Sequence, residues 1–355
     1  MTVLSTPFIG FLLAAGATMD SAAVKPSPAT PAPSAPVAEV KTIPLPGAPA
    51  DGLFLDYLAV DRARHRVWVP AGATGSVDVI DTRTLEIRRI PEFATAEIER
   101  RGQKRMVGPS SASVGDGVVY VGNRGDSSVC AIDAATLERR GCVKLDSMPD
   151  GVVYVAATHE VWVTAPRDQT IIVLDVSVPA SPKLGTSFKL EGEPEGYAVD
   201  NARGLFYTNL EDKDRTLRID ARTRKVTATW MPECGEDGPR GLAFEPAEQL
   251  LVVACPDHVE VLDAAGDGKI LSKLDTGAGV DNLDYLASTR SVYAGAAAAA
   301  TLTVAHLDAK GGLTHTRSVA TAKGARNAVV SDEGVAFLAD GPLGKVFVVE
   351  AEKKP

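Results

Sequence analysis

The chain has 355 residues, of which 45% are hydrophobic and 23% are charged, a composition typical of a globular protein with a core. Its formal net charge is −9, and its basic residues form nothing longer than the neighbouring doublets Arg100-Arg101 and Lys104-Arg105. Nucleic-acid binding requires a basic stripe that neutralises phosphates, so nucleic acid is excluded from the expected partners.

The first 23 residues have the pattern of an export signal. The run VLSTPFIGFLLAAGA is apolar but too short to cross a bilayer, and Ala15-Gly16-Ala17 and Ser21-Ala22-Ala23 supply small residues for cleavage. Residues 24–36 are rich in Pro, Ala and Ser, which favours a linker. We therefore expect a signal peptide at 1–23, a linker at 24–36, a folded domain at 37–355, a periplasmic or secreted location, and no membrane span once the signal is removed.

From residue 37 onward the chain repeats one unit seven times. Each unit contains three short apolar runs separated by polar turns, and the spacing between units is 42 to 52 residues. The third runs end in the acidic residues Asp81, Asp133, Asp175, Asp220, Asp263, Asp308 and Glu350. Strand-length runs at a period of roughly 40–50 residues are typical of a β-propeller. We predict an all-β, seven-bladed β-propeller with four-stranded antiparallel blades.

Two segments depart from the regular unit. The last unit has only the runs NAVVSD, GVAFLAD and KVFVVE, so the N-terminal segment 37–45 (VAEVKTIPL) is predicted to complete blade 7 and close the ring. The connection 91–107 is longer than the others, and its charged pattern predicts a short helix that begins near Thr95. A connection of this length is usually functional, and we expect it over the channel mouth.

The four cysteines form two pairs by position in the predicted blades. Cys130 and Cys142 lie in the third and fourth strands of blade 2, and the hairpin that turns at 134–136 places them opposite each other. Cys234 lies in the loop that leaves blade 4, and Cys255 ends the second strand of blade 5, so both lie at one blade boundary. Two disulfides are typical of proteins in an oxidising compartment.

Seven residues are expected to ring the channel mouth, because the first strand of each blade begins there. Counting five residues back from the inner-strand acidic residue, or aligning the blades, gives Asp56, Ser111, Asp150, Glu195, Arg240, Asn282 and Asn327, with Asp281 beside them. Converging carboxylate and amide oxygens bind hard cations, so Asp56, Asp150, Glu195, Asn282 and Asn327 are a candidate Ca²⁺ or Mg²⁺ site. The open alternative is that they only cap turn N–H groups in a water-filled channel.

Loops between second and third strands add polar groups on the same face. The residues Asn123, Arg124, Arg167, Asn209 and Arg240 are the candidate ligand-binding set, and the three arginines suit an anionic ligand. The open alternative is that they are solvated loop tips. The five histidines form no catalytic set, because only His258 is expected on the entry face and no Ser-His-Asp or H-E-x-x-H pattern occurs. No catalytic residue is assigned.

The units LDYLAVDRARHRVWVPAGATGSVDVIDTRTLEIRRI and GEPEGYAVDNARGLFYTNLEDKDRTLRIDARTRKVTATW resemble YVTN-type β-propeller repeats. Such repeats occur in YncE-like exported bacterial proteins. The resemblance covers nearly everything from Val37 onward and implies the propeller fold and export. The tetrapeptide itself is blurred in this chain to VYVGN, FYTNL and VWVPA, and the family is functionally mixed, so the resemblance implies no activity.

Two functional hypotheses follow. The first is an exported, non-catalytic binding or scaffolding propeller that recognises a small anionic molecule or an envelope protein over the channel mouth. The alternative is a metal-dependent hydrolase or lyase of the lactonase type, in which a channel-bound cation polarises a carbonyl and a carboxylate acts as base. Gluconolactonase-like propellers use a similar Glu/Asn/Asp set, but their E-G-P-x-W and P-N-G-L motifs are absent from this chain.

Overall fold

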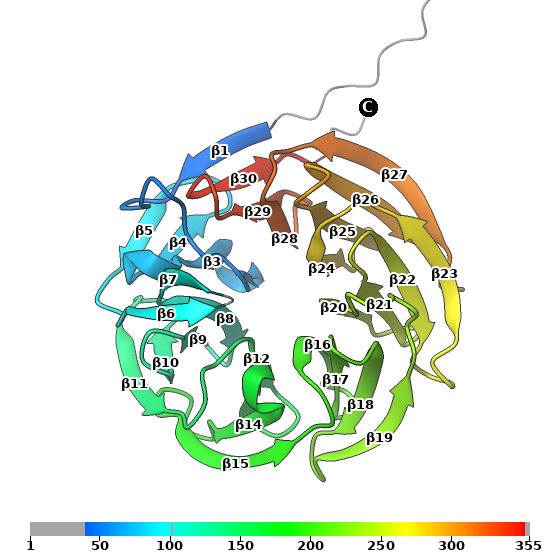
Figure 1. The fold of residues 1–355 in the computed structure, drawn as a ribbon, viewed down its shortest axis with the longest axis horizontal. Coiled ribbons are helices and arrows are strands. Elements are labelled where there is room, and N and C mark those ends of the chain that lie inside the picture. The colour runs from blue at the N-terminus through cyan, green and yellow to red at the C-terminus, as the bar shows by residue number, and fades with distance from the viewer. Residues whose placement is uncertain (1–39, 101, 352–355) are drawn as a thin grey trace, which may run out of the picture. The chain divides into compact units, whose positions relative to one another are not determined.

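The computed structural model describes residues 40–100 and 102–351, and the expected signal peptide and linker lie outside these residues. The described chain forms seven four-stranded antiparallel sheets that follow one another around a ring (Figure 1). Among the residues described, no helix has the length and hydropathy of a membrane span. The predicted seven-bladed β-propeller is confirmed.

The blades follow the chain order around the ring, and each runs from its inner strand outward (Figure 1). Blade 1 consists of β2 (Ala59–Asp61), β3 (Arg66–Pro70), β4 (Val77–Asp81) and β5 (Ile87–Ile90). Blade 2 consists of β8 (Pro109–Gly115), β9 (Val118–Asn123), β10 (Ser128–Asp133) and β11 (Arg139–Lys144). Blade 3 consists of β12 (Val152–Val155), β13 (Glu160–Ala165), β14 (Thr170–Asp175) and β15 (Lys183–Lys189). Blade 4 consists of β16 (Pro194–Asp200), β17 (Leu205–Leu210), β18 (Arg215–Asp220) and β19 (Lys225–Trp230).

The remaining elements complete the ring. Blade 5 consists of β20 (Leu242–Glu245), β21 (Leu250–Ala254), β22 (His258–Asp263) and β23 (Ile270–Asp275). Blade 6 consists of β24 (Val280–Leu286), β25 (Ser291–Ala296), β26 (Thr301–Leu307) and β27 (Leu313–Ala320). Blade 7 consists of β28 (Ala325–Val330), β29 (Ala336–Asp340), β30 (Lys345–Val349) and β1 (Val40–Pro44). Short 3₁₀ turns occur at η1 (Arg62–Arg64), η2 (Gly72–Thr74) and η3 (Pro166–Asp168).

The N-terminal strand closes the ring as predicted. Strand β1 pairs antiparallel with β30, with Val40 opposite Val349 and Pro44 opposite Lys345. The side chains of Ile43 and Leu45 are 8% and 3% exposed and pack in the cluster between blades 7 and 1. Blade 7 therefore combines the two ends of the described chain in one sheet, and β1 covers the outer edge of β30.

In the first six repeats the acidic marker lies at the end of the third strand or directly after it and caps the following turn. Asp81 accepts hydrogen bonds from the backbone N–H groups two and three residues later, at 2.9 and 2.8 Å, and Asp133 and Asp220 do the same. These hydrogen bonds favour the charged carboxylate, and they lower the pKa of Asp81. The most visible sequence signal therefore has a structural role at the outer hairpin, away from the channel.

The connection 91–107 forms a β-hairpin, so the predicted helix at Thr95 is wrong. Strand β6 (Ala96–Arg100) pairs with β7 (Gln103–Val107), with Ile98 opposite Arg105. Gly102 adopts φ +73°, a conformation that glycine permits without strain and that a tight turn requires. Pairing between β6 and β7 holds the hairpin. The spacing of Thr95, Ile98 and Glu99 fits a helix equally well, so the sequence did not indicate this pairing.

Both predicted disulfides are present. Cys130 pairs with Cys142 and Cys234 with Cys255, with Cα–Cα distances of 4.0 and 5.1 Å. Cys130 and Cys142 are opposed partners in the β10–β11 ladder, which is the geometry that the hairpin position predicted. The described chain contains no free cysteine.

Candidate functional site

A cavity of about 570 Å³ lies at the centre of the ring. Ile98, Arg105 and Val107 of the β6–β7 hairpin form part of its wall, so the long connection contributes to the channel mouth. The charged lining is acidic overall, with nine carboxylates and five guanidinium groups. The carboxylates belong to Asp56, Asp150, Glu193, Glu195, Glu211, Asp212, Glu236, Asp237 and Asp281, and the guanidinium groups to Arg105, Arg124, Arg167, Arg240 and Arg326.

The structure brings part of each predicted set to this cavity. The carboxylates of the predicted metal set, Asp56, Asp150 and Glu195, line it. All three arginines of the predicted ligand-binding set, Arg124, Arg167 and Arg240, also line it. The four predicted amides, Asn123, Asn209, Asn282 and Asn327, are not among its lining residues. The ligand roles of all these residues stay predictions.

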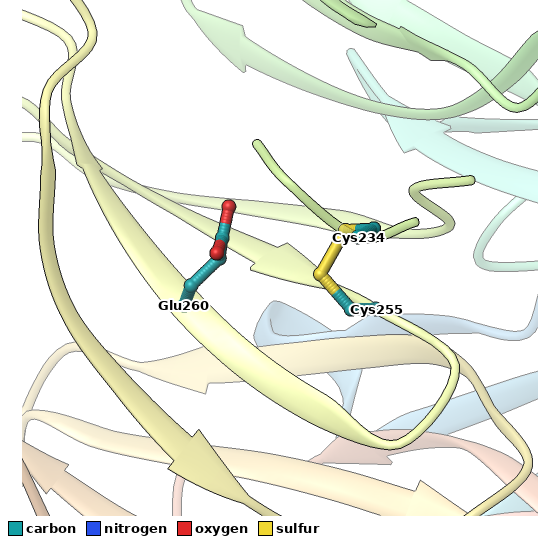
Figure 2. Close-up of side chains that lie close together, drawn as sticks. All are labelled: Cys234, Cys255 and Glu260. Atoms are coloured by element: carbon teal, nitrogen blue, oxygen red, sulfur yellow. A yellow bond between two sulfur atoms is a disulfide. The ribbon is translucent and has the colours of Figure 1, made fainter. Parts of the chain in front are cut away.

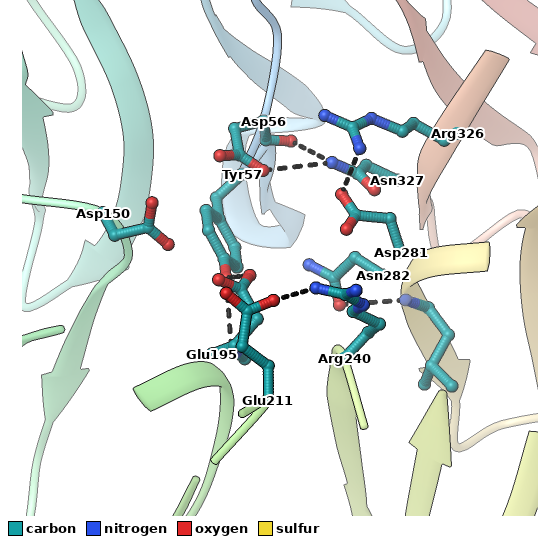
Figure 3. A network of polar contacts seen from close by, with 12 residues as sticks. Asp56, Tyr57, Asp150, Glu195, Glu211, Arg240, Asp281, Asn282, Arg326 and Asn327 are labelled. Atoms are coloured by element: carbon teal, nitrogen blue, oxygen red, sulfur yellow. Dashed lines mark hydrogen bonds and ion pairs between the residues drawn. The ribbon is translucent and has the colours of Figure 1, made fainter. Parts of the chain in front are cut away.

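The four amides make hydrogen bonds within the protein. Asn123 accepts from the backbone N–H two residues later at 3.0 Å, and Asn209 donates to a backbone carbonyl at 2.5 Å. Asn327 donates to the carbonyl of Asp56 at 3.0 Å, as Figure 3 shows, and Asn282 accepts from the next backbone N–H at 2.9 Å. In this geometry the amides hold the turns that carry the charged lining residues.

Arg124 lies between two carboxylates of the predicted metal set. Its side chain, only 8% exposed, donates to Asp56 at 2.9 Å and forms an ion pair with Asp150. It also donates to the carbonyl of Pro149 at 3.2 Å and stacks 4.5 Å from the centre of the Phe54 ring. The single positive charge of the guanidinium is therefore shared by Asp56 and Asp150 and is already balanced within the protein.

A tyrosine and a glutamate connect blades 1 and 4 across the ring. The hydroxyl of Tyr57 donates to Glu195 at 2.6 Å and accepts from the backbone N–H of Gly196 at 3.1 Å (Figure 3). The Tyr57 ring stacks on Tyr197, with ring centres 5.3 Å apart. Glu195 is thus held by a neutral partner and has no ion pair among the described residues, unlike Asp56 and Asp150.

Two further ion pairs complete the charged lining (Figure 3). Arg326 lies 2.9 Å from Asp281, and Arg240 pairs with Glu211. The guanidinium groups of Arg105, Arg124 and Arg326 all lie within 6 Å of the centre of one phenyl ring, that of Phe54, at 5.8, 4.5 and 5.9 Å. Of the five lining arginines, Arg105 and Arg167 are the two without an ion pair in the described part of the chain.

Sequence reasoning missed Tyr57, Phe54 and Arg326, and β-bulges explain part of this. The count of five residues assumes regular alternation along each inner strand. The ladder shifts register between Arg326 and Val329 and between Val280 and Leu283. Around these shifts, Arg326 and Asp281 line the cavity in place of their counted neighbours. The only feature of the sequence that could have indicated these residues is that charged residues stand next to the positions given by the five-residue count.

Burial raises the pKa of two of the acidic groups that line the cavity, Asp56 and Glu195. Burial raises the pKa of Asp56 to about 7, because the nearby Arg124 offsets desolvation only in part and Asp150 and Asp281 add repulsion. Burial also raises the pKa of Glu195 well above its usual range, and the carboxylates of Asp150, Asp281 and Asp56 raise it further. The cluster therefore keeps protons at a pH where exposed carboxylates have lost theirs.

This protonation predicts a pH-dependent stability. Between about pH 4 and about pH 7 the unfolded chain has released the Asp56 proton and the folded protein still binds it, so the free energy of unfolding falls as pH rises across this window and levels off above the folded pKa of about 7. The stabilisation is fully present below the unfolded pKa near 3.8. Asp56→Asn is expected to flatten the slope, whereas Asp51→Asn at an exposed site is expected to keep it. Urea unfolding followed by the fluorescence of the three tryptophans measures it, and equal slopes would contradict the assignment.

The acidic residues that cap the outer turns do not contribute to the pH dependence of stability in this range above about pH 5. Their carboxylates accept backbone hydrogen bonds, which lower the pKa of Asp81, Asp175, Asp220 and Asp308, and lower that of Asp133 to about 2. They are therefore ionised in both states above about pH 5, and their contribution is constant there.

The described residues contain one tight group of metal-type donors, and it lies outside the cavity. Sulfur atoms of Cys234 and Cys255 and a carboxylate oxygen of Glu260 all lie within 4.8 Å of one another (Figure 2). The two cysteines are joined by a disulfide, so neither supplies a thiolate. The carboxylates of the predicted Ca²⁺ or Mg²⁺ set, Asp56, Asp150 and Glu195, form no such group among the described residues, and Arg124 lies between two of them.

No protein-family model and no curated protein matches the chain. Solved structures match its fold. A chain of the mitotic checkpoint complex matches with a TM-score of 0.70, 15% identity, and coverage of 88% of this chain and 94% of that chain. Hydrazine synthase of Kuenenia stuttgartiensis matches with a TM-score of 0.69 and 14% identity, and the match covers 86% of this chain and 97% of that chain. A catalytically inactive virginiamycin B lyase from Staphylococcus aureus, solved with quinupristin, matches with a TM-score of 0.67 and 11% identity. That match covers 89% of this chain and 100% of the lyase chain. Identities this low establish the fold alone, and the YVTN-type resemblance stays a prediction.

Proposed function

We propose that this chain is an exported, non-catalytic binding propeller that takes a small ligand at the channel mouth through a positively charged group. The observation that carries the proposal is the lining of the cavity, in which carboxylates outnumber guanidinium groups nine to five. An acidic concave surface concentrates cations, because the low-dielectric walls focus its field. The size of the cavity is within the range of small-molecule sites.

An anionic ligand, which the three arginines led us to expect, has less support than a cationic one. Arg124 is paired with Asp56 and Asp150, and Arg240 is paired with Glu211, so an anion would have to displace protein carboxylates from both. Only Arg167 of that set lacks an ion pair among the described residues. Two of the lining carboxylates, by contrast, are available to a cation: Glu236 and Asp237 are exposed at the cavity and carry no ion pair in the described chain.

Calorimetric titration with spermidine and, separately, with citrate tests this proposal. We expect heat of binding with spermidine, and a loss of affinity of about tenfold in the double variant Glu236→Gln, Asp237→Asn, which corresponds to about 1.4 kcal/mol. The matched control is Glu86→Gln with Asp267→Asn, which removes two exposed carboxylates that do not line the cavity. Binding of citrate but not spermidine would contradict the cationic ligand, and binding of neither would leave a protein partner as the better hypothesis.

The alternative enzyme hypothesis has one observation in its favour. The second carboxylate oxygen of Asp150 is buried and accepts no hydrogen bond, so one donor of the predicted metal set is open. A lactonase-type mechanism would need a cation there, and Arg124 occupies the position between Asp150 and Asp56 that such an ion requires. A lyase chemistry that depends on histidine finds none among the lining residues. Thermal unfolding with Ca²⁺ or Mg²⁺ against EDTA separates the hypotheses, because only a bound metal shifts the midpoint.

Export is proposed on two grounds. The two disulfides are typical of a protein that folds in an oxidising compartment. The N-terminal sequence has an apolar run followed by small residues, as in a cleaved signal. Mass spectrometry of the mature protein from a periplasmic fraction tests the proposal, since an intact N-terminus or reduced cysteines would contradict it.

A further inference from the structure

A buried carboxylate lies beside the disulfide at the boundary of blades 4 and 5. Glu260 is opposite Val253 in the β21–β22 ladder and opposite Lys273 in the β22–β23 ladder. Opposed residues point to the same face of a sheet. Val253 belongs to the apolar cluster between blades 4 and 5, so Glu260 enters the same boundary, where the Cys234–Cys255 bond crosses it (Figure 2).

Burial leaves this carboxylate poorly compensated. Glu260 is 0% exposed, and among the described residues its oxygens have no neutral hydrogen-bond donor, so its partners are cationic or titratable side chains. The nearest cation is the Lys273 ammonium, 3.2 Å from Oε2, and the ring nitrogen Nε2 of His258 lies 3.8 Å from the same oxygen. Burying a carboxylate is costly even beside one cation, and no part of the proposed binding function uses this one. Its proximity to both sulfurs calls for a chemical explanation.

The two sulfurs differ in access. Cys255 is fully buried, whereas Cys234 is partly exposed in the loop 231–241 between β19 and β20. An external thiolate therefore reaches the sulfur of Cys234, and Cys255 becomes the leaving group, beside Glu260. A leaving thiolate in a buried site is stabilised by a proton donor close to it.

We propose that Cys234–Cys255 is an exchange-active disulfide, with Glu260 as the group that protonates the departing Cys255 thiolate when an external dithiol opens the bond. The thiolate of the dithiol attacks the sulfur of Cys234, the S–S bond breaks, and its electron pair goes to the sulfur of Cys255, which takes the proton of Glu260. The second thiol of the reagent, deprotonated by solvent, then attacks the mixed disulfide. Cys234 leaves and is protonated from water, the reagent is oxidised to its disulfide, and Glu260 recovers a proton from solvent.

The surroundings support a proton on Glu260 at neutral pH. Burial raises the pKa of Glu260 to about 7, against the lowering effect of Lys273 and His258. The charged groups that face this site are Lys273 from β23, His258 from β22, and Asp214 and Glu233 from the two loops. Asp214 accepts from the backbone N–H of Cys234 at 3.1 Å and raises the pKa of Glu260, so the loop that carries the disulfide is tied to the same charge network.

The bond also holds one wall of the cavity. The loop 231–241 carries Glu236, Asp237 and Arg240, which line the cavity, and the disulfide attaches this loop to blade 5. Opening the bond releases that attachment. The exchange chemistry stands without the proposed ligand, whereas an effect of reduction on spermidine affinity rests on the proposed function.

The second disulfide is a matched internal control. Cys130–Cys142 joins one buried and one exposed cysteine, so its outer cysteine is more exposed than Cys234, and no carboxylate lies in a tight group with its sulfurs in the described chain. Dithiothreitol is added at a series of pH values, free thiols are trapped by alkylation, and the rate for each bond is divided by the concentration of reagent thiolate. We expect Cys234–Cys255 to open at least about tenfold faster than Cys130–Cys142 at about pH 6, as general acid catalysis predicts.

The pH profile decides whether Glu260 is the acid. The corrected rate for Cys234–Cys255 is expected to fall as pH rises through about 7 and to show no such fall in Glu260→Gln. Lys273→Met removes the compensating cation and is expected to move the fall to higher pH while the fold is kept, a readout that a structural role would not change. Equal corrected rates for the two bonds, or the same profile in wild type and Glu260→Gln, would overturn the proposal, and neither result bears on spermidine binding by the oxidised protein.

Discussion

Arg124→Met is expected to destabilise the propeller by about 3–5 kcal/mol, the usual effect of breaking a buried ion pair from one side. The guanidinium pairs with Asp56 and Asp150, and its side chain is 8% exposed. Methionine fills most of the volume against Phe54 but leaves both carboxylates without a cation. The loss comes from uncompensated buried charge, since Asp56 already has a raised pKa with the arginine present.

Urea unfolding of wild type, Arg124→Met and Arg167→Met measures this effect. Arg167 is an exposed cavity-lining arginine without an ion pair among the residues described, so its replacement is expected to change stability by no more than about 0.5 kcal/mol. The Arg124 variant is expected to recover as pH falls, because protonation removes the unpaired charges, and Asp56→Asn in the same chain is expected to recover part of the loss. A pH-independent loss would mean that packing, and not charge, explains the effect.

Ile43→Asp in the ring-closing strand is expected to destabilise the protein by about 3 kcal/mol or more, because a charged group would enter an apolar cluster. Ile43 is 8% exposed and packs where blade 7 meets blade 1. Strand β1 covers the outer edge of β30, and an uncovered edge pairs with other chains. The variant is therefore expected both to unfold at lower urea and to associate on size-exclusion chromatography.

Thr42→Asp is the matched control, since Thr42 lies in the same strand with its side chain exposed. It is expected to change stability by no more than about 0.5 kcal/mol. A truncation series separates the strand from the preceding sequence: a chain that begins at Ala38, where the compact unit starts, is expected to stay monomeric, and one that begins at residue 46 is expected to aggregate. A soluble, cooperative monomer without β1 would show that the ring closes by other contacts.

The blade count, the closing strand and both disulfides were predictable from sequence. The repeat is visible because the acidic residue at the end of each third strand caps a local turn, as Asp81 and Asp133 do, and local geometry repeats with the chain. The Cys130–Cys142 pair follows from the register of one hairpin. The closing strand follows from the repeat itself, because the last unit lacks its fourth strand and a ring must be completed by the other end of the chain.

The hairpin at 96–107 and the charge pairing at the channel mouth were decided by tertiary structure. The spacing of Thr95 and Ile98 fits a helix turn as well as a strand, and the hairpin is distinguished only by pairing within the fold. Counting located Asp56, Asp150 and Glu195 at the cavity, but it did not predict that Arg124 from blade 2 would form ion pairs with two of them. Whether converging carboxylates bind a cation or an arginine depends on side chains from different blades that meet across the ring, and the bulges near Arg326 and Val280 change which of them face the centre. Such contacts join residues far apart in the chain, so no local sequence pattern records them, and only the closed ring brings them within a few ångströms of one another.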